Sequence, residues 1–110
     1  MEELAKDLYK RVSMISEAYY YQKDDAVIKK GGQLAGKIQQ YCSVFLQGNV
    51  FGMDDDEYQS LQNYVIQVLK DYMGALEKKD LVWMLDTLDY GLRELLKIYI
   101  DTETGEDAVG

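Results

Sequence analysis

Apolar residues recur along the first half of the chain at steps of three and four, the spacing that places side chains on one face of an α-helix. The first such stripe predicts a helix over residues 2–22 and consists of Leu4, Leu8, Val12, Ile15 and Tyr19. A second stripe predicts a helix over residues 26–47 and consists of Val27, Leu34, Ile38, Cys42 and Phe45. Because the chain has no proline, nothing forbids helices of this length.

Two further helices begin at marked capping residues in the second half of the chain. Asp54 followed by Glu57 has the side chains of a capping box and predicts a helix over residues 54–77. Asp80 predicts the start of a helix over residues 80–100. The apolar stripes of these two helices are Tyr58, Leu61, Val65, Val68, Tyr72 and Leu76 in the one, and Leu81, Leu85, Leu88, Leu92, Leu95 and Tyr99 in the other.

The short link between the last two helices sets the predicted architecture. Only the polar stretch Glu77-Lys78-Lys79 separates them, so they must lie antiparallel as a hairpin. Four helices of this length close most economically as an antiparallel up-down four-helix bundle. The sequence therefore predicts an all-α fold with one bundle domain over residues 1–100 and an acidic, flexible tail over residues 101–110.

The segment GGQLAGKI is a candidate nucleotide site, because Gly31, Gly36 and Lys37 fit the start of a phosphate-binding loop. That loop needs a hydroxyl after the lysine and a parallel sheet to hold it, whereas this chain has Ile38 and no second strand. Two helical interpretations remain open. Either Gly32 and Gly36 form a strip of small residues that lets another helix approach a continuous or kinked helix, or the paired glycines break it. Lys37 is expected to face solvent.

The charge of the chain excludes several classes of partner. The formal net charge is −8, and residues 51–110 carry fourteen acidic and five basic side chains. Such a chain repels phosphate backbones and anionic lipids, so we expect neither nucleic acid nor membrane partners. No apolar run approaches the roughly 20 residues that cross a bilayer, which predicts a soluble, cytoplasmic protein.

The residue types that catalysis and metal binding need are scarce. The chain has no histidine and one cysteine, Cys42, which its apolar neighbours predict to be buried and inert. Asp86 and Asp89 are expected on the outer face of the last helix as solvated carboxylates. We therefore expect no enzymatic activity, no cofactor and no metal site.

Tyrosine is the unusual feature of the composition, with ten residues against two phenylalanines. Tyr19, Tyr20 and Tyr21 are consecutive and span about 200° of a helix surface, so one core cannot bury all three. Tyr19 continues the inner stripe, and Tyr20 or Tyr21 should be partly exposed. Two interpretations stay open, namely tyrosines at the bundle edge with their hydroxyls in water, and a protein contact patch.

Two other apolar features are candidate contact sites. Phe51 lies in a link, residues 49–53, that is unusually apolar for a connection. This link either folds back to plug the end of the bundle or presents Phe51 as an apolar knob. Trp83 and Met84 widen the apolar face of the last helix, which fits a broad core contact or a dimer seam.

One segment, GALEKKDLVWMLDTLDYGLRELLK (residues 74–97), carries a family resemblance. Its Ala-Leu pair, polar link with Asp, aromatic residue and leucine-rich helix resemble the helical hairpin of small bacterial flagellar export chaperones. The resemblance implies a helical bundle that shields an export substrate or an assembly partner. It implies no role for an individual residue.

These observations lead to a functional hypothesis. We expect a noncatalytic protein–protein interaction module, acting as an adaptor, a chaperone-like factor or a homodimer. Its expected contact residues are Tyr20, Tyr21, Phe51 and Trp83. The alternative is a ligand-binding domain or enzyme with a tyrosine-lined pocket between helices.

Overall fold

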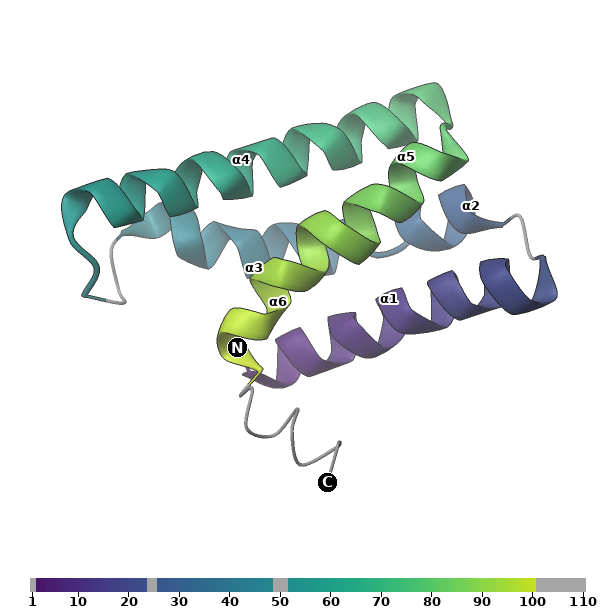
Figure 1. Ribbon diagram of the computed structural model, residues 1–110, viewed down its shortest axis with the longest axis horizontal. Coiled ribbons are helices and arrows are strands. Elements are labelled where there is room, and N and C mark those ends of the chain that lie inside the picture. Colours follow the sequence, from purple (N-terminus) through teal and green to yellow (C-terminus); the bar gives the residue numbers. More distant parts are fainter. Residues whose placement is uncertain (1, 24–25, 49–51, 101–110) are drawn as a thin grey trace.

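The computed structural model describes residues 2–23, 26–48 and 52–100 (Figure 1), and every secondary-structure element in these ranges is helical. The predicted all-α class is therefore confirmed. The elements are α1 (Glu2–Gln22), α2 (Val27–Gly32), α3 (Ala35–Gln47), α4 (Asp55–Lys78) and a last run made of α5 (Leu81–Asp86), the π-helical turn η1 (Thr87–Leu92) and α6 (Arg93–Tyr99). The predictions for Phe51 and for the tail over residues 101–110 fall outside the described residues.

The helices form a flattened body whose principal extents are 43 × 38 × 19 Å. Figure 1 shows α1 and α4 along opposite edges, with the run from α5 to α6 crossing obliquely in front of α2 and α3. The start of this run packs against α4 and its end packs against α1, so it joins the two edges. In the described part of the chain, no helix has both the length and the apolarity needed to cross a membrane.

Local capping chemistry fixes two helix starts. The Asp54 carboxylate accepts the Glu57 amide at 2.8 Å, and the Glu57 carboxylate accepts the Asp54 amide at 3.4 Å, which completes the predicted capping box. The Asp80 carboxylate accepts the Trp83 amide at 3.0 Å. Between them Lys79 ends α4 in the left-handed region, at φ 53°, and turns the chain back. The capping roles predicted for Asp54 and Asp80 are confirmed.

The core contains the predicted apolar stripes. Their fully buried members include Leu8, Val12, Ile38, Phe45, Val65, Leu88 and Leu95. Leu4, Tyr19, Leu61, Leu76, Leu81 and Tyr99 are half-buried and pack against them. Cys42 is fully buried as predicted, and burial raises the pKa of its thiol to about 12. The thiolate is therefore scarce at neutral pH.

The predicted second helix, residues 26–47, is interrupted at Gln33 and Leu34. Both residues keep right-handed helical dihedrals, and the Leu34 amide donates to the Gly31 carbonyl three residues back at 3.1 Å. The interruption is a tight turn between two helices rather than a departure from helical backbone. Residues 27–32 form a helix, so the kinked alternative describes this segment better than a loop.

The glycines at this kink differ in their surroundings. A Cβ on Gly31 would lie 3.1 Å from the Met84 sulfur, and a Cβ on Gly32 would lie 3.2 Å from Leu76, so another helix approaches closely at both. A Cβ on Gly36 would meet no neighbouring atom within 4 Å, so no helix approaches closely there. The prediction of a strip of small residues for close helix packing is therefore wrong for Gly36. Lys37 is half-buried, and its ammonium lies 3.3 Å from the Asp7 carboxylate.

Candidate functional site

A wide helical turn, η1, builds the candidate site in the middle of the last helical run. The Arg93 amide donates to the Leu88 carbonyl, five residues back, which is the hydrogen bond of a π-helix. Such a turn holds one more residue than an α-helical turn. It therefore changes the positions around the helix axis of the side chains that come after it. The prediction that Asp89 is a solvated carboxylate is wrong, because its side chain is only 14% exposed.

Asp89 holds together the floor of a groove between α1 and this turn. The buried Ser16 hydroxyl of α1 donates to Asp89 Oδ1. Arg93 Nη2, one helical turn further along, donates to the same oxygen at 3.1 Å. The Arg93 guanidinium also lies over the Tyr9 ring, 5.0 Å from its centroid. The floor is thus a serine–carboxylate–guanidinium network that fixes α1 to the last helical run.

Three tyrosines from two segments rim this groove, which has a volume of about 490 Å³. Tyr20 and Tyr21 come from the end of α1 and are 56% and 83% exposed, and Tyr90 comes from η1 and is 70% exposed. Partial burial, followed by the nearby Asp89, Tyr90 and Asp86, raises the pKa of Tyr20. A tyrosine hydroxyl is protonated at neutral pH and can donate a hydrogen bond. We call this feature the tyrosine groove.

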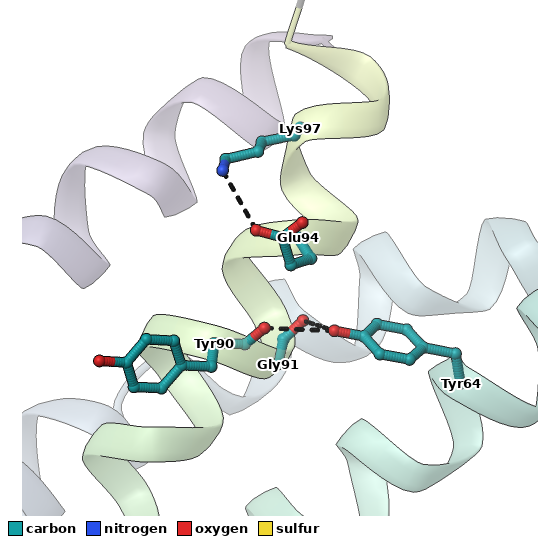
Figure 2. Close-up of polar contacts among 5 residues, drawn as sticks. All are labelled: Tyr64, Tyr90, Gly91, Glu94 and Lys97. Atoms are coloured by element: carbon teal, nitrogen blue, oxygen red, sulfur yellow. Dashed lines mark hydrogen bonds and ion pairs between the residues drawn. The ribbon is translucent and has the colours of Figure 1, made fainter.

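Tyr64 of α4 supports the π turn from the opposite side (Figure 2). Its hydroxyl donates to the carbonyl oxygens of Tyr90 at 3.2 Å and of Gly91 at 2.9 Å. Figure 2 shows the Tyr64 and Tyr90 rings on opposite sides of the last helical run. A Cβ on Gly91 would lie 3.3 Å from Val68 Cγ2, so this glycine lets the turn lie close to α4. The π turn is therefore held between α1 and α4.

The predicted contact residues divide between two places. Tyr20 and Tyr21 line the tyrosine groove, and Tyr19 is half-buried against the core, as the spacing predicts. Trp83 is elsewhere, because it is half-buried and its ring occupies the space that a side chain at position 74 would need, with Cη2 2.4 Å from the site of a Gly74 Cβ.

Sequence reasoning identified only Tyr20 and Tyr21 of the groove, and it missed the other lining residues, among them Ser16, Asp89 and Tyr90. One signal was present, since Gly91 interrupts an otherwise leucine-rich helix at a cost of about 1 kcal/mol in helix propensity. Such a glycine indicates a local irregularity or a close approach, and here the structure shows both.

The groove brings aromatic and charged side chains together. It combines three aromatic rings with the Glu17 carboxylate and an ion pair in which Lys97 Nζ lies 3.1 Å from Glu94 Oε2. Among the described residues, no three carboxylate or thiol side chains gather in a way that would hold a metal ion. Ser16 donates to the Asp89 carboxylate, which also accepts from Arg93, so this carboxylate joins α1 to the last helical run.

The chain matches no protein-family model, and it shows no significant similarity to a curated protein or to a solved structure. A functional assignment must therefore come from the groove and from the surfaces around it.

Proposed function

We propose that the protein is a noncatalytic interaction module that binds a segment of a partner protein in the tyrosine groove. The observation that carries the proposal is the convergence of Tyr20, Tyr21 and Tyr90 from two helical segments on one groove, with more than half of each side chain exposed. Tyrosine provides a large apolar ring and a hydrogen-bonding hydroxyl at low conformational cost, and it is enriched at interface hot spots. An adaptor or a chaperone-like factor would use such a groove.

The charges around the groove indicate the chemistry of the partner. Glu17, Asp89 and Glu94 line it together with Arg93 and Lys97, which leaves an excess of one negative charge. Asp86 also lies close enough to raise the pKa of Tyr20. A lysine or arginine of the partner would gain both a carboxylate and the face of a tyrosine ring. The net charge of −8 would also attract a basic segment from a distance. We therefore propose a partner segment in which basic residues alternate with apolar ones.

The buried tyrosines favour this proposal over a ligand pocket or an active site between helices. The Tyr41 and Tyr72 hydroxyls donate to backbone carbonyls at 2.6 Å each, so neither is left to contact a ligand. For the architecture we propose an up-down four-helix bundle in which α2 and α3 together are the second member, because the helices follow one another through short links. We propose the cytoplasm as its location.

Affinity capture from an extract of the native cell, quantified by mass spectrometry, tests the binding proposal. The bait Tyr20→Ser/Tyr90→Ser should recover the specific partner at a level at least tenfold below wild type. Met14→Ser is the matched control, since Met14 is also on α1 and is 58% exposed but does not line the tyrosine groove. Circular dichroism confirms that each bait is folded. Equal recovery by both variant baits, or no protein above background with wild type, contradicts the proposal.

A further inference from the structure

A second exposed groove follows α4 on the side away from the core. It has a volume of about 480 Å³ and is lined by Ile66, Leu69, Lys70, Met73, Gly74 and Glu77. Ile66 and Met73 are 40% and 62% exposed and lie two helical turns apart on this face. The surface is apolar apart from a single lysine and a single glutamate.

The order of charged and apolar positions on this face is self-complementary. Lys70 and Glu77 are seven residues apart, two helical turns, and Met73 and Gly74 lie midway between them. When two such helices run antiparallel about a twofold axis between Met73 and Gly74, each Lys70 lies opposite Glu77 of the partner subunit. Each Met73 then lies opposite Gly74 of the partner subunit, where the Trp83 ring fills the space beside the glycine.

We propose that a second copy of this chain covers the face, forming a homodimer through antiparallel α4 helices. A twofold interface uses the same patch on both copies, so it needs the self-complementarity that this face has. Ile66 and Met73, the exposed apolar side chains of the groove, both lie on the face that the second copy would cover.

The acidic start of α4 selects the antiparallel orientation. Asp54, Asp55, Asp56 and Glu57 are consecutive and exposed. A parallel pair would bring these four residues of both copies together and would place Lys70 against Lys70 of the partner subunit. The antiparallel pair separates the two acidic ends by roughly 55 Å along the helix axis, at 1.5 Å per residue. The charge pattern therefore favours one orientation of one partner.

The dimer proposal does not depend on the tyrosine groove, because that groove lies between α1 and the last helical run, while α4 forms the opposite edge of the molecule (Figure 1). The two proposals fail separately in experiments. Tyr20→Ser/Tyr90→Ser should leave the dimer dissociation constant unchanged, and variants of the α4 groove should leave partner capture unchanged apart from any loss of avidity.

Sedimentation velocity over a wide range of protein concentration tests the dimer. The wild type should show a monomer–dimer equilibrium. Lys70→Glu and Glu77→Lys should each raise the dissociation constant about tenfold, because each replaces two attractive contacts with repulsive ones. The exchange variant Lys70→Glu/Glu77→Lys should return to within about threefold of wild type, since the pairing is restored with its direction reversed.

Lys78→Glu is the matched control, because Lys78 is exposed on the same helix but does not line the α4 groove. It should leave the dissociation constant close to that of wild type. Met73→Asp should leave only monomer, with an unchanged helical circular dichroism spectrum. A wild-type chain that is monomeric at every concentration overturns the proposal, as does an exchange variant that is no better than the single variants.

Discussion

The interior tyrosines and the groove tyrosines use the same side chain in different ways. Tyr41 and Tyr72 are 0% and 2% exposed, and each hydroxyl donates to a backbone carbonyl of another helix at 2.6 Å. Tyr20, Tyr21 and Tyr90 are more than half exposed and lie together on one groove. The comparison shows that the number of tyrosines alone says little about function, because part of the set is structural.

The interior hydroxyls satisfy carbonyls near the ends of helices. Tyr72 donates to Gly31 in the last turn of α2, and Tyr58 donates to Phe45 in the last turn of α3 at 2.9 Å. The Gly31 carbonyl also accepts the Leu34 amide, so the Tyr72 hydroxyl is an additional donor to it. A hydrogen bond of this kind contributes about 0.5–1.5 kcal/mol. Tyrosine can reach such a carbonyl while its ring fills the core, which phenylalanine cannot do.

Truncation of an interior tyrosine is the largest expected effect. Tyr41→Ala should lower the free energy of unfolding by about 3–5 kcal/mol, because it leaves a cavity and removes the hydrogen bond to the Leu95 carbonyl. The Tyr41 ring also packs edge-on against Phe45 and Tyr99, with centroids 5.3 and 5.8 Å apart. Urea denaturation followed by circular dichroism measures the change.

Tyr21→Ala is the matched comparison, since its side chain is 83% exposed. It should change the free energy of unfolding by less than about 0.5 kcal/mol. Similar losses for Tyr41→Ala and Tyr21→Ala would remove the distinction between the two sets of tyrosines.

Local chemistry explains which parts of the fold were predictable from sequence. The capping side chains of Asp54 and Asp80 act on amides three residues away, so the sequence nearby contains the whole signal. The exposure of Tyr20 and Tyr21 follows from helix geometry alone. These predictions are confirmed because no distant residue is needed to decide them.

The π turn and the groove floor depend on contacts that no local pattern contains. Ser16 and Asp89 are 73 residues apart, and Tyr64 reaches the π turn from a different helix. The leucine stripe of residues 81–99 is compatible with an unbroken α-helix, so it gave no reason to expect Asp89 to turn inward. The use of the tyrosine groove, of Trp83 and of Phe51 as contact sites stays a prediction.

Alkaline pH should lower the stability of the protein through the interior tyrosines, by less than the loss expected for Tyr41→Ala. Burial raises the pKa of Tyr72 from 10.0 to about 12. Below pH 10 both folded and unfolded chains keep this proton, so the contribution of Tyr72 to stability is fully present there. Between pH 10 and 12 the unfolded chain releases the proton first, so stability falls as pH rises. The loss from Tyr72 should approach about 3 kcal/mol, because each pH unit between the folded and unfolded pKa values corresponds to a little over 1 kcal/mol.

Urea denaturation at a series of pH values measures this loss, and Tyr72→Phe provides the control. The variant should be less stable than wild type at neutral pH, yet the difference should shrink between pH 10 and 12. Burial also raises the pKa of Tyr41, so the variant should keep part of the alkaline slope. Parallel pH profiles for Tyr72→Phe and wild type would contradict the assignment.

Tyr64 lies between the two sets and should give the smallest effect. It is 38% exposed, and its hydroxyl donates to the π turn that carries Asp89 and Tyr90. Tyr64→Phe should cost about 0.5–1.5 kcal/mol of stability and should speed amide hydrogen exchange within η1, because the turn loses its support from α4. Tyr58→Phe removes a similar hydrogen bond at α3 and should leave exchange in η1 unchanged. Equal exchange in η1 for both variants would show that the π turn stands without Tyr64, and that the core and the groove are independent.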